Sequence, residues 1–157
     1  MINFSLFCKS NHWPARKKKV DIMIHRILKY KDSLNFNKKI NYVCNIILAD
    51  DILLKEINLK FRKKNNSTDV LTFVSETKNI NKKKQKICDI FVSADIVKKD
   101  AKQNKINFYN HLTHIIIHSF LHINGYDHKK NIDFNSMKKI EISVLNKFGI
   151  KNPYLIN

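Results

Sequence analysis

The sequence predicts a single domain in which helices and strands are mixed along the chain, an α/β arrangement. Its 157 residues fit the roughly 100 to 200 residues of a typical domain. A hydrophobic content of 43% is enough to build a core. Only 2 Gly and 2 Pro are present, so most of the chain should lie in regular elements joined by short turns. No repeat or low-complexity linker divides the sequence, and we expect residues 1–157 to form one domain.

The N-terminal part should contain two strands and a helix. Ile2–Cys8 alternates in polarity as a half-buried strand does, and Val20–Lys31 has apolar residues at helical spacing. Ile40–Leu48 is rich in β-branched and aromatic residues, which suit a buried strand.

The middle of the chain should add a helix and a hairpin. Asp50 or Asp51 can cap a helix that runs to about Lys60. Two further short strands are expected at Val70–Val74 and Ile87–Val92, and the polar, basic segment between them predicts a hairpin excursion.

Three helices should complete the domain. Ser93 can cap a helix that runs to about Asn104. Phe108–Ile123 is more apolar and should be a central helix that ends at Gly125. Ile132–Phe148 predicts a last amphipathic helix, closed by a glycine.

Composition argues against several classes of protein. No apolar run approaches the roughly 18 residues of a membrane span, so no membrane partner is expected. Met1–Cys8 has no basic region before it and no small-residue cleavage site after it, unlike a signal peptide. The three cysteines are far apart, which favours reduced thiols over a disulfide framework. We therefore expect a cytoplasmic protein.

The charge of the chain has two interpretations. Its 30 Lys and Arg against 13 Asp and Glu give +17, which favours a polyanionic partner such as RNA. Lys supplies 27 of the 30 basic residues, and Ile and Asn are also abundant, which indicates a coding bias unrelated to any ligand. Charge alone leaves both interpretations open.

The segment from His118 to His128 contains the strongest chemical signal. His118 and His122 are four residues apart, so on a helix their imidazoles share one face. Gly125 can adopt the left-handed conformation that ends a helix, and the chain can then return His128 to the same point. Three neutral imidazoles leave the fourth position of a tetrahedral ion open, as in catalytic zinc sites. The spacing therefore predicts one Zn²⁺ per chain at the end of the central helix.

Neighbouring residues qualify this prediction. His111 and His114 lie upstream on the same helical face and could compete as ligands, but they lack the return geometry, so we assign them packing or supporting roles. The ligand spacing equals that of metzincin peptidases, in which a glutamate after the first histidine is the general base. Here that residue is Ser119, which is too weak a base. The residues thus favour a metal but not a peptide substrate.

Arg62 is a candidate for binding phosphate. Arginine is rare in this lysine-rich chain, and one just before a strand suggests a need for the planar guanidinium fork. Arg16 and Arg26 are equally rare and have no such setting, so composition alone leaves the role of Arg62 open.

Taken together, these segments resemble the YbeY family of bacterial endoribonucleases, which take part in ribosomal RNA maturation. The resemblance covers roughly residues 51–154. Its most specific motif is His-Gly-x-x-His, an apolar pair and Gly-Tyr-Asp-His, here residues 118–128. The family's Asn-x-x-Tyr/Phe-Arg and Thr-Asp-Val-Leu-Ser-Phe segments correspond to Asn58–Arg62 and Thr68–Phe73, and its Gly-Asp-Ile strand to Cys88–Ile90.

Three positions depart from the family pattern: Ser119 and Cys88 replace glycines, and Val74 replaces a proline. All three substitutions are small or compatible with strands, so we expect local packing changes rather than lost chemistry. The resemblance implies zinc at the same three histidines, a substrate-cleft role for Arg62, and an α+β fold with a mixed four-stranded sheet.

The expected activity is zinc-dependent cleavage of single-stranded RNA in ribosomal RNA maturation and ribosome quality control, with the small ribosomal subunit as a partner. A zinc-bound hydroxide would act as nucleophile or base, and Arg62 would clamp a phosphate. Residues expected to support the site are His114, Asp127 and Asp89. Candidate RNA contacts are Lys82, Lys83, Lys84, Lys129 and Lys130.

Two other classes remain open at this point. A zinc hydrolase of peptides or small amides would need a carboxylate base near the metal, for which Asp89 and Glu76 are candidates. A non-enzymatic ribosome-binding factor with a structural metal would bind RNA without cleaving it.

Overall fold

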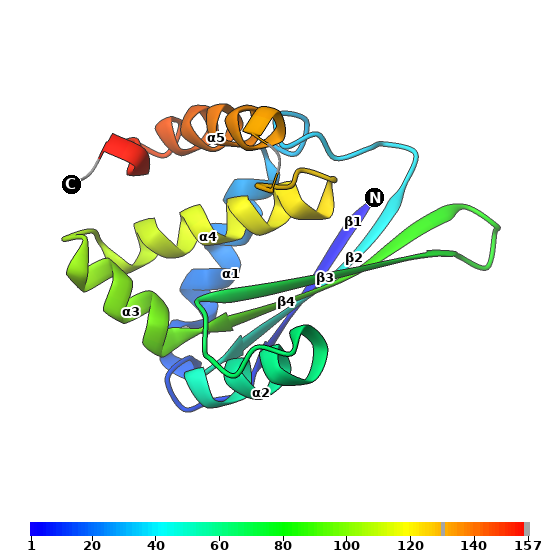
Figure 1. Ribbon diagram of the computed structural model, residues 1–157. Helices are drawn as coiled ribbons and strands as arrows, with labels where there is room; N and C mark the ends of the chain where they lie inside the picture. The colour runs from blue at the N-terminus through cyan, green and yellow to red at the C-terminus, as the bar shows by residue number, and fades with distance from the viewer. Residues whose placement is uncertain (130, 156–157) are drawn as a thin grey trace.

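The computed structural model describes residues 1–129 and 131–155, which form one sheet surrounded by helices (Figure 1). The strands are β1 (Ile2–Cys8), β2 (Asn41–Ala49), β3 (Val70–Lys78) and β4 (Lys84–Ser93). The helices are α1 (Lys17–Leu28), α2 (Asp51–Arg62), α3 (Ala94–Gln103), α4 (Phe108–Ile123) and α5 (Asn131–Asn146), with short 3-10 turns at Pro14–Arg16 and Pro153–Leu155. In this part of the chain, no helix combines the length and apolar character needed to span a membrane.

The sheet is mixed, with strand order β1-β2-β4-β3. β1, β2 and β4 run parallel, and β3 pairs antiparallel with β4 at the edge. The parallel strands are linked by crossovers that contain helices, whereas β3 and β4 form a hairpin. The expected α+β domain with a mixed four-stranded sheet is therefore confirmed.

The two faces of the sheet are covered unequally. α1, α4 and α5 lie on one side and α2 lies on the other (Figure 1). The larger core lies on the α4 side, and its fully buried side chains include Trp13, Ile24, Ile46, Ile90, Ile116 and Phe120. The core under α2 is a small cluster built on Ala49, Leu54 and Leu71. Burial of apolar surface in this larger core therefore holds α4 in place. The α4 residues that line the cleft face β3.

Side-chain caps define where the helices begin. Of the two aspartates considered, Asp50 is the cap of α2, because its Oδ1 accepts a hydrogen bond from the backbone N–H of Leu53 at 2.9 Å. Ser93 caps α3 in the same way through the N–H of Ile96. Asn107 caps α4, which starts at the expected Phe108. The caps at Asp50 and Ser93 were expected from the sequence, whereas the cap at Asn107 was not.

The β3–β4 hairpin is longer than the sequence predicted. The polar segment between the two expected strands extends both of them, and only residues 79–83 form the turn. Glu76 stabilises the extension, because its carboxylate pairs with Lys84 at 3.2 Å and with Lys86 at 3.8 Å across the ladder. The strand ends at residues 75–78 and 84–86 are mostly exposed and do not pack on the core. Their sequences therefore lack the apolar periodicity that would have predicted a strand. Smaller differences occur at α1, which spans 17–28 rather than 20–31, and α5, which spans 131–146 rather than 132–148.

Candidate metal centre

Three histidines converge at the C-terminal end of α4. His118 and His122 face each other with 2.9 Å between their Nε2 atoms. α4 stops at Ile123, and Gly125, at φ +94°, turns the chain so that His128 comes back to the pair. One ring nitrogen from each histidine lies within 4.8 Å of the other two. The structure thus brings together the three residues that the spacing singled out, in a group that could hold a metal ion.

The hydrogen bonds of His118 and His122 determine which nitrogens are available. The Nδ1–H of His122 donates to the carbonyl of Tyr126 at 2.8 Å, and that of His118 donates to Oε1 of Glu141 at 2.5 Å. Both acceptors are oxygens without a proton, so each Nδ1 carries the hydrogen and, in the neutral ring, each Nε2 presents a lone pair. Two lone pairs facing each other at 2.9 Å repel unless a positive charge lies between them. The donor set therefore fits a metal cation.

Burial keeps the second ligand candidate neutral. The pKa of His122 is lowered by desolvation and then by the nearby charge of His118. A neutral imidazole is the form that binds metal, so the surroundings favour metal over protons at this position.

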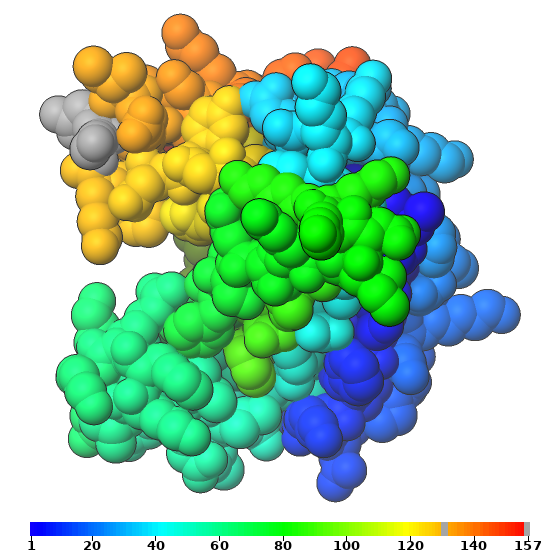
Figure 2. All heavy atoms as spheres, turned by 90° about the vertical axis from the view of Figure 1, so that its right-hand side faces the viewer, coloured from blue at the N-terminus to red at the C-terminus, as the bar shows by residue number. Residues whose placement is uncertain are grey.

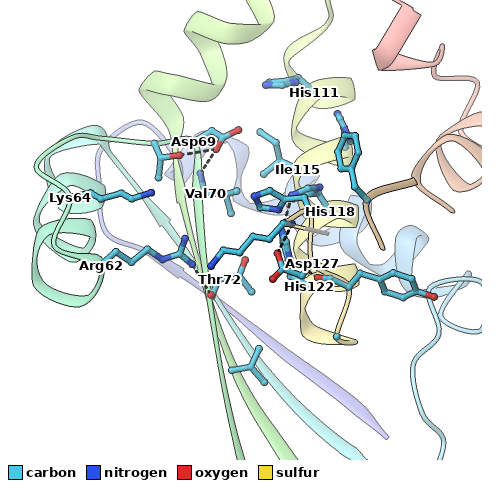
Figure 3. Close-up of a pocket in the computed structure, with 18 of the residues that line it drawn as sticks. Arg62, Lys64, Asp69, Val70, Thr72, His111, Ile115, His118, His122 and Asp127 are labelled. Carbon is cyan, nitrogen blue, oxygen red and sulfur yellow. Dashed lines mark hydrogen bonds between the residues drawn. The ribbon is translucent and has the colours of Figure 1, made fainter. Parts of the chain in front are cut away.

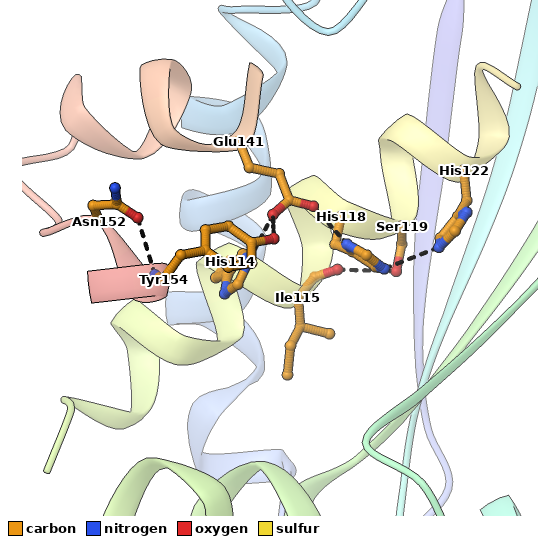
Figure 4. A network of polar contacts seen from close by, with 8 residues as sticks. All are labelled: His114, Ile115, His118, Ser119, His122, Glu141, Asn152 and Tyr154. Atoms are coloured by element: carbon orange, nitrogen blue, oxygen red, sulfur yellow. Dashed lines mark hydrogen bonds and ion pairs between the residues drawn. The ribbon is translucent and has the colours of Figure 1, made fainter. Parts of the chain in front are cut away.

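Glu141 holds two of the α4 histidines in position by hydrogen bonds, and the sequence analysis did not identify it. Its side chain is fully buried on α5 and bridges His118 and His114, whose Nε2 donates to Oε2 at 2.9 Å (Figure 4). The hydroxyl of Tyr154 donates to the same oxygen. Burial by itself raises the pKa of Glu141, but the hydrogen bonds from His114 and His118 outweigh it and bring the pKa to about 2. Glu141 is therefore an ionised carboxylate that orients a candidate ligand.

A signal for Glu141 was present in the sequence. The buried residues Met137, Val144 and Leu145 form the apolar face of α5, and Glu141 lies on the same face by helical spacing. A lone carboxylate there is costly unless it has partners.

The candidate metal centre opens into a cleft of about 1140 Å³ between α4 and the β3–α2 side of the molecule. Figure 2 shows the hollow between the segment that follows α4, in yellow, and α2, in blue-green. Arg62 and Lys64 line the wall opposite the histidines, together with Thr72 (Figure 3). The cleft is therefore bordered by candidate ligands on one side and by basic side chains on the other.

Arg62 lies at the last position of α2 and is exposed. Its guanidinium donates one long hydrogen bond of 3.4 Å to the carbonyl of Thr72 and lies 5.5 Å from the ring centre of Phe73. No carboxylate within the described chain pairs with it. Arg62 thus keeps most of its donors available for an anion in the cleft.

The other predicted site residues differ in whether they line the cleft. Asp127 and Lys129 line the cleft, and Oδ1 of Asp127 accepts from the N–H of Lys129 at 3.1 Å. Asp89 does not reach the cleft. It alternates with the core residues Cys88 and Ile90, so it faces the α2 side of the sheet, where it accepts a hydrogen bond from Asn45 at 2.8 Å.

The predicted RNA-contacting lysines also differ in position. Lys82 and Lys83 lie in the turn of the β3–β4 hairpin, which projects away from the helices (Figure 1), and Lys84 pairs with Glu76. Lys130 lies outside the described residues. Among the four of these lysines that the structure describes, Lys129 is the one at the cleft.

Fold and site together define a class of protein: an α+β domain with a three-histidine group, open to a basic-walled cleft, at the end of its central helix. A family model described as Endoribonuclease YbeY matches residues 6–149. The chain belongs to this family of endoribonucleases, so it is a hydrolase that acts on RNA.

Individual relatives agree with this assignment. An "Endoribonuclease YbeY" of Anaplasma phagocytophilum is 39% identical over 116 residues, covering 74% of this chain and 73% of the relative. One of Ehrlichia ruminantium is 33% identical over 156 residues, covering 99% and 96%. The fold is similar to the solution structure of TM1509 from Thermotoga maritima, with a TM-score of 0.58, 24% identity and coverage of 95% and 92%.

Proposed function

We propose that the protein is a zinc-dependent endoribonuclease that cleaves single-stranded RNA during ribosomal RNA maturation and ribosome quality control. The observation that carries this proposal is the convergence of His118, His122 and His128 on a cleft whose opposite wall contains Arg62. Ribosomal RNA, presented by the small ribosomal subunit, is the proposed substrate. That substrate would place the protein in the cytoplasm.

The donor chemistry supports zinc. Three imidazole nitrogens are borderline-soft ligands that suit Zn²⁺, and a three-ligand set leaves a position for substrate or water. When bound there, zinc supplies Lewis acidity and a nucleophile at neutral pH. Glu141 and the Tyr126 carbonyl hold the rings of His118 and His122 so that both Nε2 lone pairs face that ion.

The opposite wall would bind and orient RNA. Arg62 can donate two parallel hydrogen bonds to a phosphate and stabilise the charge that develops on its oxygens as the bond breaks. Lys64 and Lys129 line the same cleft and add sequence-independent attraction for the backbone. Asp127, beside the third histidine, is the cleft carboxylate closest in sequence to the ligands and can accept a proton or hold a ring.

Peptide hydrolysis is less well supported. Ser119, at the position of the metzincin glutamate, is fully buried, and its hydroxyl donates to the carbonyl of Ile115 at 3.0 Å. Of the two carboxylates considered as bases, Asp89 faces the other side of the sheet and Glu76 is paired with Lys84 and Lys86. A purely structural metal is also disfavoured, because His128 is exposed and the histidines open into the cleft.

The test is incubation of the zinc-loaded protein with a labelled single-stranded RNA, a duplex of the same sequence and a peptide library. We expect cleavage of the single strand alone, and its loss when a chelator removes the metal. Binding of the single strand should weaken with salt at a slope of about −0.7 in log affinity per phosphate contact. RNA binding without cleavage would leave the ribosome-binding factor as the function, and peptide cleavage would replace the proposal.

A further inference from the structure

A second group of metal-ligating side chains lies at the other end of the cleft. Asp69 immediately precedes β3, Asp100 lies on α3, and His111 lies in the first half of α4. One donor atom from each is within 4.8 Å of the other two. Asp69 and His111 line the cleft, so an ion has a path to the group (Figure 3). Three elements that are distant in sequence therefore present two carboxylates and an imidazole to one point.

His111 lacks the partners that the other histidines of α4 have. His114, His118 and His122 each form at least one hydrogen bond through a ring nitrogen. Both ring nitrogens of His111 are buried, and neither has a hydrogen-bond partner within the described chain. Ring nitrogens in this state have lost their hydration without replacement, which is costly. A cation between His111 and the two aspartates would satisfy one of its nitrogens.

The two carboxylates also lack an ion-pair partner. The protein has 30 Lys and Arg, yet in the part that the structure describes none of them forms an ion pair with Asp69 or Asp100. Desolvation, and next the charge of Asp69, raises the pKa of Asp100. Asp69 is nevertheless held in position, because its Oδ1 accepts from the N–H of Val70 at 2.8 Å and from the hydroxyl of Thr68 at 3.2 Å. Two oriented, partly buried carboxylates without an ion-pair partner are well suited to bind a cation.

We propose that Asp69, Asp100 and His111 bind a second divalent cation, of the Mn²⁺ type, distinct from the ion at the three histidines. Carboxylates suit Mg²⁺, Ca²⁺ and Mn²⁺, whereas an imidazole argues against the first two, so the mixed set favours Mn²⁺. His111 and His118 are seven residues apart on one helix, which separates the two sites by roughly 10 Å along the axis. Two-metal catalytic pairs lie about 3.5–4 Å apart, so this ion is not a partner in the same chemical step.

The site has a consequence for substrate binding, and this step rests on the proposed function. Without a cation, Asp69 would repel RNA phosphates from one end of a cleft that otherwise attracts them. With a cation, the same end becomes an attachment point for a phosphate next to the one being cleaved. The occupied site would therefore help to position a neighbouring nucleotide.

The binding test avoids both RNA and zinc. In a His122→Ala background, which removes the three-histidine site, Mn²⁺ binding is followed by the loss of the free-ion signal in electron paramagnetic resonance. We expect one bound Mn²⁺ per chain, weakened at least about 10-fold by adding Asp100→Asn, since even a supporting group typically accounts for that much. The matched control is Asp32→Asn, which removes an exposed carboxylate that pairs with Lys38. Equal Mn²⁺ affinity with and without Asp100→Asn, or no bound Mn²⁺ at all, would overturn the proposal.

Thermal unfolding supplies a second test on the otherwise unmodified chain. Without divalent ions, Asp100→Asn should raise Tm, because it removes a desolvated charge beside Asp69. In excess Mn²⁺ the order should reverse, since only the wild type gains stability from binding at this second site, whereas any binding at the three histidines stabilises both proteins equally. A Tm difference that Mn²⁺ does not change would contradict the site, whether or not the protein cleaves RNA.

Discussion

The two walls of the cleft are built in different ways. On the α4 wall, His118 and His122 are half-buried, and each has its Nδ1 committed to an acceptor, the carboxylate of Glu141 or the carbonyl of Tyr126. On the β3–α2 wall, Arg62 is exposed and held by a single 3.4 Å hydrogen bond to Thr72. The first wall is rigid before any ligand arrives, whereas the second can adjust.

This difference matches what each wall would bind. A metal ion requires ligands within tenths of an ångström, so the α4 wall is fixed by a buried network. An RNA backbone is long and flexible, and a guanidinium at the end of an exposed side chain can follow it. Changes on the first wall should therefore alter metal content, and changes on the second should alter the cleavage rate alone.

The largest expected effect is from His122→Ala on the rigid wall. Loss of one of three ligands should lower the zinc content by one equivalent per chain and abolish cleavage, because two imidazoles hold zinc poorly. Elemental analysis and the RNA assay measure both, with circular dichroism to show that the chain remains folded. His111→Ala is the matched control on the same helix and should keep its zinc. A His122→Ala protein with a full equivalent would refute the ligand assignment.

Arg62→Lys tests the adjustable wall. Lysine keeps the charge but loses the fork, so the single-turnover cleavage rate should fall by about 10²-fold, as the loss of one preorganised donor typically does. Zinc content should stay the same, because the metal ligands are on the other wall. RNA affinity should change little, because lysine keeps the positive charge. Arg26→Lys is a suitable control, since Arg26 lies on α1 over Phe148 and does not line the cleft. A normal rate for Arg62→Lys would remove Arg62 from the mechanism.

Glu141→Gln measures how much the network behind the rigid wall contributes. Glutamine keeps the shape but not the charge that orients His118, and zinc affinity should fall by about 10- to 100-fold. The saturated enzyme should keep most of its activity, because Glu141 is buried behind the ligand rather than in the cleft. A chelator competition gives the affinity, and Glu56→Gln on the exposed face of α2 is the control. Unchanged zinc affinity would mean that Glu141 has only a packing role.

Local signals explain which structural features the sequence could predict. Asp50, Ser93 and Gly125 lie at helix ends where a side-chain cap or a left-handed turn is needed, and the structure uses them there. Alternating polarity in Ile2–Cys8 and the apolar, β-branched content of the other three segments located the four strands of the sheet, although not the polar extension of the hairpin beyond Val74. The i, i+4 spacing of His118 and His122 is a property of one helix and required no knowledge of its neighbours.

Long-range packing decided the rest. Glu141 lies on α5, 23 residues after His118 in the sequence, yet it forms a hydrogen bond with that histidine. Asp89 points away from the cleft because of the register of its strand. Asp69, Asp100 and His111 meet only because β3, α3 and α4 pack together. The sequence by itself determined which segments form the elements, several of the helix ends and the three-histidine group, because these depend on residues close along the chain. The tertiary structure alone decided which charges face each other across the cleft. Burial and strand register act between segments that are distant in sequence, and neither segment indicates which other segment it will pack against.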